Sequence, residues 1–348
     1  MSLHGLATQA LRNLDPEDAH GWAIRGLKWG LGPVAPKGDA FLATTLAGLK
    51  LPNPVGLAPG FDKNAEVFGP MHRAGFGFVE CGTVTPLAQP GNPRPRMFRL
   101  SEDRGVINRL GFNNQGLEPY AARMAARDPA KITGANIGAN KDTEDRAADY
   151  VIGLKRLWGL ASYFTVNISS PNTPGLRALQ TKAALEDLLG RLSETRSALP
   201  REKDVPIFLK VAPDLEDGEV VAICEVVKAS GLQGIIIGNT TLSRPESLRS
   251  PLKAEAGGLS GAPLSALSTR MVRAFRQAAG PSLAIIGCGG IGSGGEAYAK
   301  IRAGAGAVQL YSALVFEGPG LVQSIKRDLS ARLKADGFAS VAEAVGTG

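Results

Sequence analysis

The chain has 348 residues, of which 44% are hydrophobic and 20% are charged, and its formal net charge is +7. This composition supports a large core, either one α/β barrel or two smaller domains, and excludes a disordered protein. The lysines and arginines are scattered along the chain, which argues against a nucleic-acid-binding protein. A mildly basic surface instead favours anionic substrates, phosphates or an anionic membrane surface.

Cysteine and histidine patterns argue against disulfides and metal sites. The chain has three cysteines, an odd number, and no CxxC pair, as expected for small core residues in a reducing compartment. The three histidines lie outside the predicted strand ends, so we expect neither a histidine-based triad nor a metal site. No apolar stretch approaches the ~18 residues of a membrane span, and the N-terminus lacks a signal-peptide pattern. We therefore predict a soluble or peripheral protein.

Residues 1–38 are predicted to form a small helical segment ahead of the main domain, residues 39–348. Asp15, followed by Pro16 and two acidic residues, is a helix start signal between two helical stretches. Tryptophan and leucine cover much of the second stretch, and such a short pair of helices has little to bury itself against. Two interpretations remain open: the helices pack on the main domain, or they form a lipid-facing lid. Residues 32–39 form a linker by composition.

After the linker, apolar β-rich runs alternate regularly with helical stretches. Near-continuous apolar strands separated by helices are typical of a parallel sheet buried on both faces. Eight such units predict an α/β fold, a (β/α)8 TIM barrel, with its active site at the carboxyl ends of the strands. An open doubly wound sheet is disfavoured, because most strand ends carry polar residues instead of one switch point. The strands are predicted within residues 51–60, 75–86, 132–140, 163–172, 205–215, 231–241, 283–291 and 305–313, with helices at 181–199 and 218–230.

The ends of the first six predicted strands carry amides, hydroxyls and lysines. The fourth end, NISSPNTPG, holds more hydrogen-bonding side chains than a turn requires. Each such residue alone has a structural explanation, as a turn residue or a lysine reaching the surface, but a barrel brings all of them together. No pair of carboxylates stands out, which disfavours glycosidase chemistry. The polar residues are Lys63, Thr83, Asn136, Asn167, Ser170, Asn172, Lys210, Asn239, Thr240 and Thr241.

The seventh predicted strand ends in the glycine-rich sequence GCGGIGSGG. Gly287, Gly289 and Gly292 satisfy GxGxxG between a strand and a helix, which alone predicts a dinucleotide site. The acidic residue expected about 20 residues later is missing. In a barrel, the loops after strands seven and eight form a phosphate site instead. A monophosphate beside amides and a lysine favours FMN, since Lys210 can stabilise the negative charge of the reduced ring.

The motifs GFDKN, NRLGFNN, NISSPNTPG, KVAPDL, NTT, GGLSG, GCGGI and LYSAL occur in this order over roughly residues 45–330. As an ordered set they resemble the dihydroorotate dehydrogenase family. The N-terminal LDPEDAH segment resembles its class 2, quinone-dependent branch, and Ser170 agrees, because class 1 enzymes carry cysteine there. The resemblance implies FMN-dependent oxidation of (S)-dihydroorotate to orotate in pyrimidine biosynthesis, with a membrane quinone as electron acceptor.

The resemblance also implies roles for individual residues, with Ser170 as the base. Two positions depart from the family pattern: Gly238 stands where threonine is frequent, and Cys288 where valine is frequent. The implied substrate contacts are Lys63, Asn108, Arg109, Leu110, Gly111, Phe112, Asn167, Asn172, Asn239 and Thr240. The implied FMN contacts are Pro59, Gly60, Phe61, Asp62, Lys63, Thr83, Asn136, Asn167, Lys210, Gly238, Gly261, Gly290, Tyr311 and Ser312.

The class 2 resemblance implies a peripheral membrane protein on the cytoplasmic face of the inner, or cell, membrane. We expect a monomer that binds no nucleic acid, with the N-terminal helices as an apolar route for quinone. Arg12, Arg25 and Lys28 accompany the tryptophans and leucines of this segment, a combination suited to anionic lipid.

Three other functions were weighed against this one. A Schiff-base aldolase would use Lys210, and a class 1 dehydrogenase would use fumarate or an NAD-linked partner subunit. Ser170 and the N-terminal helices disfavour the class 1 enzyme. A non-catalytic phosphate-binding barrel would not need Ser170 and Lys63 together.

Overall fold

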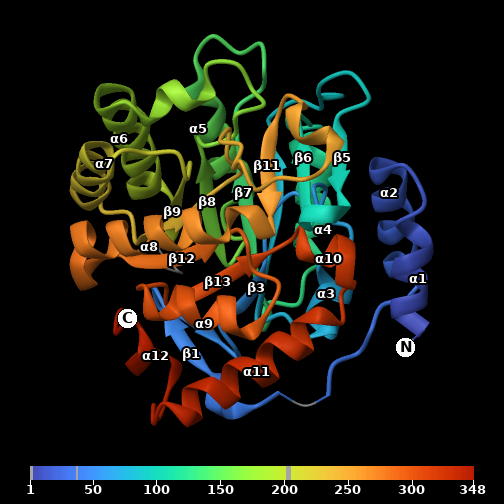
Figure 1. Cartoon of the computed structure of the whole chain (residues 1–348). Helices are drawn as coiled ribbons and strands as arrows, with labels where there is room; N and C mark the ends of the chain where they lie inside the picture. Colours follow the sequence, from blue (N-terminus) through green and yellow to red (C-terminus); the bar gives the residue numbers. More distant parts are fainter. Residues whose placement is uncertain (1–2, 37, 201–204) are drawn as a thin grey trace.

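The computed structural model describes residues 3–36, 38–200 and 205–348, and its centre is a closed barrel of eight parallel strands (Figure 1). Neighbouring strands pair in parallel all the way around, and the last strand, β13, pairs with the first, β3. Each predicted strand is present, so the predicted TIM barrel is confirmed. The barrel strands are β3 (Val55–Leu57), β4 (Phe78–Val84), β7 (Ile132–Ile137), β8 (Tyr163–Asn167), β9 (Ile207–Val211), β10 (Gly234–Ile237), β12 (Ala284–Cys288) and β13 (Ala307–Leu310).

Both faces of the barrel strands are buried, as their apolar sequences require. One face packs against the surrounding helices, and the other fills the interior with a cluster that includes Phe78, Tyr163 and Phe208. The interior accepts these rings because small residues stand beside them. A Cβ atom at Gly134 would lie 2.2 Å from the ring of Tyr163, so only glycine fits there.

Helices follow the strands and cover the outside of the barrel (Figure 1). The helices predicted at residues 181–199 and 218–230 are confirmed as α6 and α7. A capping box between Glu216 and Glu219 starts α7. The helices after the N-terminal segment are α3 (Phe68–Ala74), α4 (Leu117–Ala125), α5 (Arg146–Leu157), α6 (Lys182–Ala198), α7 (Asp217–Ala229), α8 (Ser265–Ala279), α9 (Gly294–Arg302), α10 (Ala313–Glu317), α11 (Leu321–Ala335) and α12 (Val341–Ala344).

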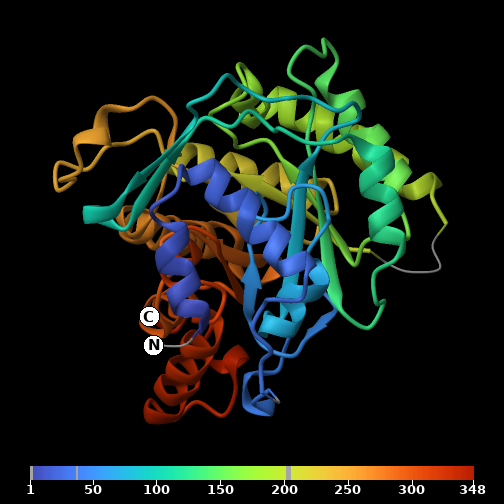
Figure 2. The ribbon, with the colours of Figure 1, turned by 90° about the vertical axis from the view of Figure 1, so that its right-hand side faces the viewer.

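The N-terminal segment forms two helices, α1 (Leu3–Leu11) and α2 (Pro16–Lys28), as predicted. Asp15 caps α2, because its side chain accepts hydrogen bonds from the backbone N–H groups of Glu17 and Asp18. The pair lies across one side of the barrel, where α1 contacts α10 and α2 contacts β5 (Figure 2). Within the described ranges, no helix combines the length and the apolar character needed to cross a membrane.

A second, antiparallel sheet stands over the carboxyl ends of the barrel strands. Its strands are β5 (Met97–Leu100), β6 (Gly105–Asn108) and β11 (Gly258–Gly261), in the order β11-β6-β5. It joins the long insertion after β4 to the loop after β10, since Asn108 pairs with Gly258. Neither segment is predicted from the sequence to contain a strand, so this sheet is not predicted.

A hairpin of β1 (Thr44–Leu46) and β2 (Leu49–Leu51) lies at the opposite end of the barrel (Figure 1). Leu46 and Leu51 belong to the same buried cluster as the interior residues Phe78 and Tyr163. The hairpin therefore closes the amino end of the barrel with apolar side chains.

Candidate active site

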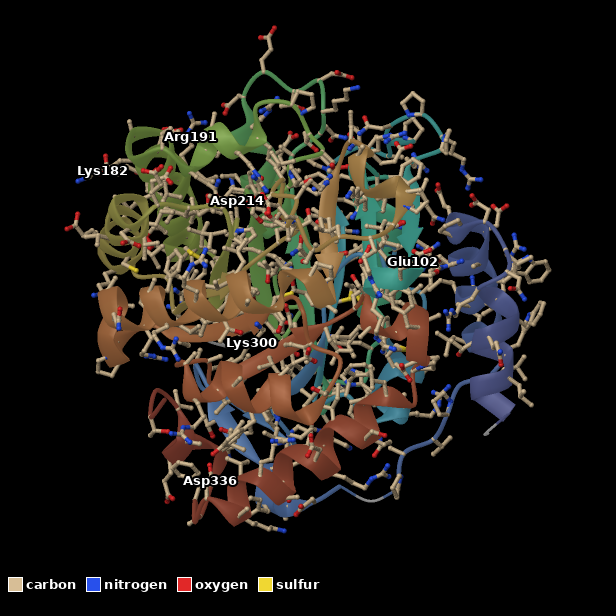
Figure 3. All side chains as sticks on the ribbon, viewed as in Figure 1. Glu102, Lys182, Arg191, Asp214, Lys300 and Asp336 are labelled. Atoms are coloured by element: carbon tan, nitrogen blue, oxygen red, sulfur yellow. The ribbon has the colours of Figure 1, made fainter. Side chains whose placement is uncertain are left out.

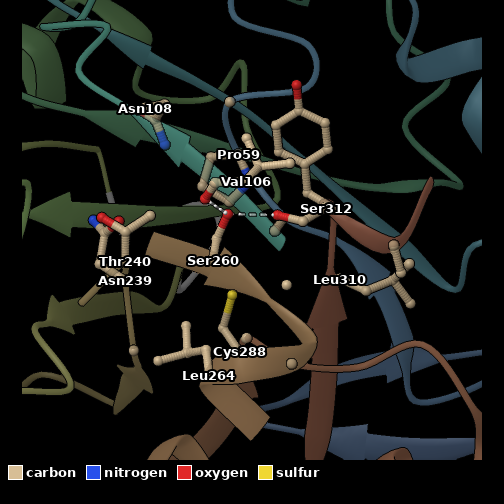
Figure 4. Close-up of a pocket in the computed structure, with 18 of the residues that line it drawn as sticks. Pro59, Val106, Asn108, Asn239, Thr240, Ser260, Leu264, Cys288, Leu310 and Ser312 are labelled. Carbon is tan, nitrogen blue, oxygen red and sulfur yellow. Dashed lines mark hydrogen bonds between the residues drawn. The ribbon is translucent and has the colours of Figure 1, made fainter. Parts of the chain in front are cut away.

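A cavity of about 380 Å³ lies between the carboxyl ends of the barrel strands and the small sheet. Figure 4 shows Asn239 and Thr240 on one side of it and Leu310 and Ser312 on the other, with Cys288 between them. Its size is typical of a small-molecule site. The predicted site residues that line it are Pro59, Gly60, Lys63, Thr83, Asn108, Leu110, Gly111, Phe112, Asn167, Ser170, Asn172, Lys210, Gly238, Asn239, Thr240, Gly261, Gly290, Tyr311 and Ser312.

Four predicted site residues do not line this cavity: Phe61, Asp62, Arg109 and Asn136. Asp62 is buried and accepts hydrogen bonds from two backbone N–H groups at the start of α3. Arg109 points away, since it forms an ion pair with Glu255 and stacks over the ring of Phe98. Phe61 packs edge to face against the ring of Tyr311, which does line the cavity, and a strand-end pattern cannot distinguish such an indirect position from direct contact.

Asn136 acts on the cavity wall through a chain of hydrogen bonds. The side-chain amide of Asn167 donates to the Thr83 hydroxyl at 2.9 Å, and Thr83 donates to the Asn136 side-chain oxygen at 2.6 Å. Asn136 in turn donates to the carboxylate of Glu80 at 2.7 Å. A carboxylate only accepts hydrogen bonds. Glu80 therefore sets which group donates and which accepts at every step of this series up to Asn167.

Glu80 lies inside the barrel with no exposed surface. Its second carboxylate oxygen accepts hydrogen bonds from the Tyr163 hydroxyl at 3.0 Å and from the Gln309 amide at 2.7 Å. Sequence reasoning missed this residue. The only signal was an acid in the middle of an otherwise apolar strand, FVECGTV.

Two lysines give the cavity its positive charge. Lys210 is 4% exposed, and its ammonium lies 4.0 Å from the sulfur of Cys288. No carboxylate of the described residues lies within ion-pair distance of it. Burial lowers the pKa of Lys63 to about 8; the nearby charge of Glu17 acts to raise it, and that of Arg96 to lower it. A cavity with two such cations is suited to anionic ligands.

Ser170 lies on the loop that follows β8 and is 5% exposed. Its hydroxyl oxygen accepts a hydrogen bond from the backbone N–H of Asn172 at 3.3 Å, and the Asn172 side chain donates to Asn108 at 3.2 Å. The loop is also held by Arg177, which donates to the backbone oxygens of Ser169 and Thr240.

Arg177 also forms an ion pair at 3.0 Å with Asp214, which is labelled in Figure 3. It thereby ties the loop after β8 to the loops after β9 and β10. Sequence reasoning did not single out Arg177, because it lies beyond the strand-end motif and acts through backbone contacts.

The glycine-rich loop after β12 forms a tight cradle. Gly290 has a φ of 68°, and a Cβ atom there would lie 2.3 Å from the Cα of Ser265 at the start of α8. The end of β13 lies beside this cradle, where the Ser312 hydroxyl donates to that of Ser260 at 2.8 Å. Exposed backbone N–H groups and hydroxyls in such a loop suit a phosphate.

A second, mainly apolar cavity of about 490 Å³ lies under α1 and α2. It shares part of its wall with the first cavity, since four residues line both: Met97, Val106, Tyr311 and Val315. His20 of α2 lies in the second cavity, with its Nδ1 atom 3.4 Å from the Tyr311 hydroxyl. Burial lowers the pKa of His20 to about 3, so its ring is neutral near pH 7. The sequence analysis did not assign His20 a role.

The sequence model of the family described as "Dihydroorotate dehydrogenase" matches residues 41–333. The chain belongs to this family. Two bacterial relatives named dihydroorotate dehydrogenase (quinone) match it along almost their whole length. The protein of Xanthobacter autotrophicus is 55% identical and that of Azorhizobium caulinodans is 54% identical, each with 99% of both chains covered.

Solved structures agree with this assignment. The structure of DHODH from Eimeria tenella in complex with ferulenol has a TM-score of 0.91 and 40% sequence identity, covering 96% of this chain and 95% of that one. The ligand-free form gives a TM-score of 0.92 at the same identity, with 99% of that chain covered. As a dihydroorotate dehydrogenase of the quinone-dependent kind (EC 1.3.5.2), the chain is an oxidoreductase of pyrimidine biosynthesis, which excludes the aldolase and the non-catalytic barrel.

Proposed function

We propose that this chain oxidises (S)-dihydroorotate to orotate with bound FMN and passes the electrons to a membrane quinone. The observation that carries the proposal is the pair of cavities. One contains two lysines, several amides and Ser170, and the other is almost entirely apolar and lies under the N-terminal helices. The two cavities share a wall that includes Tyr311. A flavin in the first cavity can therefore take electrons from dihydroorotate in that cavity and pass them to a quinone in the second.

The residues present fit FMN. The Gly290 cradle and Ser312 suit its phosphate, and the buried Lys210, without a carboxylate partner in the described chain, suits a ring that becomes negative on reduction. When bound, FMN supplies the hydride acceptor. We assign its binding to Pro59, Gly60, Thr83, Asn167, Lys210, Gly238, Gly261, Gly290, Tyr311 and Ser312, with Phe61, Asp62 and Asn136 supporting them from behind.

The substrate site consists of Lys63 and several amides. An ammonium ion suits the carboxylate of dihydroorotate, and amides can both donate to and accept from the ring N–H and C=O groups. The hydroxyl oxygen of Thr240 is buried without a hydrogen-bond partner, and Thr240 lines the cavity. The amides that line the cavity are Asn108, Asn167, Asn172 and Asn239.

Ser170 is placed to take the proton from C5 of dihydroorotate. Serine is a weak base in water, so it needs a site from which water is excluded. Its loop is closed by the hydrogen bonds of Asn172 and Arg177, and the positive charges of Lys63 and Lys210 line the same cavity. These charges favour the negative charge that develops on the substrate as the proton leaves.

The N-terminal helices provide a route for quinone and a membrane contact. Trp22, Trp29 and Leu31 of this segment are exposed although they are large and apolar, and Arg25 stacks on Trp22. Tryptophans flanked by basic residues suit the interface of an anionic bilayer. We propose peripheral attachment to the cytoplasmic face of the cell membrane, as a monomer.

Purified protein should release FMN on denaturation, and dihydroorotate should bleach the bound flavin under anaerobic conditions. The control is L-lactate, which lacks the pyrimidine ring and should leave the spectrum unchanged. Release of FAD, or an oxidised spectrum that persists in excess dihydroorotate, would contradict the proposed function.

Orotate affinity should fall as the pH rises above about 8, because Lys63 loses the proton that lets it hold the orotate carboxylate. The charged form predominates below this pKa, so the dissociation constant should be flat from pH 6.5 to 7.5 and rise by about tenfold by pH 9. The dissociation constant is measured from the change in flavin absorbance as orotate is added. Lys63→Met should bind weakly with no such rise, and a wild-type constant that stays flat to pH 9 would show that Lys63 does not hold the carboxylate.

A further inference from the structure

Glu17 of α2 forms an almost buried ion pair with Arg96 of the insertion after β4. The carboxylate receives two parallel hydrogen bonds, at 3.0 Å from Nε and at 2.7 Å from Nη2, and Arg94 adds a contact at 3.2 Å. The two paired side chains are 11% and 9% exposed. Burial acts to raise the pKa of Glu17, but the hydrogen bonds and charge of Arg96 outweigh it and hold the pKa below its ordinary value.

The third guanidinium nitrogen of Arg96 holds the loop before β5. Its Nη1 atom donates to the backbone oxygens of Pro90 and Asn92, each at 2.7 Å. The loop is closed tightly around the guanidinium, since Gly91 has a φ of 77° and a Cβ atom there would lie 2.8 Å from Nη1. Arg96 therefore holds Asn92 in place together with a backbone hydrogen bond from the Asn92 N–H to the Leu110 oxygen at 3.0 Å.

Asn92 connects this loop to the substrate site. Its side-chain amide donates to the backbone oxygen of Asn172 at 3.1 Å and to that of Arg109 at 2.9 Å. Asn172 lies on the loop of Ser170, and its backbone N–H donates to the Ser170 hydroxyl. An unbroken series of hydrogen bonds thus runs from α2 to the loop that carries the proposed base.

We propose that Glu17 is a positioning residue for the substrate site, acting through Arg96 and Asn92 on the loop of Asn172. The inference rests on the proposed function of that site. Among the described residues, none before Ala58 lines the first cavity, so Glu17 cannot contact the substrate directly. Without its carboxylate, Arg96 would keep a buried charge with unpaired donors, and the loop that it holds would lose its fixed position.

The test uses the full-length, FMN-loaded protein with Glu17→Gln, which keeps the shape but places an N–H donor against the guanidinium. Orotate is titrated at pH 6.5, where Lys63 is protonated, so that loss of the Glu17 charge does not act through that lysine. We expect the orotate dissociation constant and the KM for dihydroorotate to rise by about tenfold, with less than about twofold change in flavin reduction at saturating substrate.

Asp18→Asn is the matched control. Asp18 is the next residue of α2, is exposed and pairs with Arg94 at 3.2 Å, so the variant removes the same charge from the same helix without touching Arg96. Its orotate affinity should equal that of the wild type. Equal affinity in Glu17→Gln and wild type, or an equal loss in both variants, would overturn the proposal.

Asn92→Ala interrupts the same series from the barrel side and leaves the buried ion pair intact, so it tests the proposal even if Glu17→Gln folds poorly. It should weaken orotate binding by a similar factor, and the double variant should be no weaker than either single one. Effects that multiply in the double variant would show that Glu17 acts by another route. Failure of the wild-type flavin to respond to orotate would instead contradict the proposed function.

Discussion

Replacing Ser170 by alanine should slow the reduction of bound flavin by dihydroorotate by about 10²–10⁴-fold, the usual contribution of a general base. The variant keeps the cavity, the two lysines and the amides, so it should retain FMN and bind orotate within about threefold of the wild type. Anaerobic stopped-flow absorbance at saturating dihydroorotate measures the rate.

Ser170→Cys is the informative companion variant. Class 1 members of the family carry cysteine at this position, so we expect the cysteine variant to retain part of the rate that alanine loses. Orotate titration of both variants is the control for an intact cavity. Flavin reduction by Ser170→Ala at the wild-type rate would rule out Ser170 as the base.

Deleting residues 1–36 should lower the rate of flavin reoxidation by a long-chain quinone in vesicles by about 10²-fold or more. The deletion removes α1 and α2, which line the second cavity, and with them the local concentration that membrane attachment provides. The barrel elements remain, so FMN binding and flavin reduction at saturating dihydroorotate should persist. Flavin reduction by dihydroorotate and flavin reoxidation by quinone are measured separately, so that a loss in one can be told from a loss in the other.

A small soluble electron acceptor is the control for this deletion, because it needs neither the membrane nor the apolar cavity. It should reoxidise the flavin of the truncated protein at nearly the wild-type rate. Since the deletion also removes Glu17, dihydroorotate should bind more weakly, as in Glu17→Gln. Equal quinone rates with and without the segment would show that the helices only pack on the barrel.

The barrel was predictable because its strands are short, apolar on both faces and separated by helices. The small sheet was not, because β5, β6 and β11 have only four residues each and none of them carries a continuous apolar run. Arg99 interrupts the apolar run of β5, and in β6 only Val106 and Ile107 are apolar residues with a large side chain. Such strands are defined by pairing with distant segments, as Gly258 pairs with Asn108, and no local pattern reveals that partner.

The candidate site was predictable where a side chain stands at a strand end, as with Thr83 and Asn239. A parallel barrel brings these positions together whatever their separation in the chain. Residues that contact the cavity only through other residues were not predicted from the sequence. Glu80 lies one layer deeper in the barrel, and Asn92 acts from a loop through backbone oxygens. Their roles depend on distances that only the folded chain defines.

The β1–β2 hairpin leaves the barrel open at only one end. Leu46 and Leu51 seal the amino end, so a water-soluble acid and a lipid-soluble oxidant must both approach from the same rim. On this rim, α1 and α2 cover the mainly apolar second cavity, and the small sheet and the loop of Ser170 border the first cavity. Under the proposed membrane attachment, the molecule would rest tilted on the bilayer, with α1 and α2 against the lipid and the entrance beside the loop of Ser170 open to solvent.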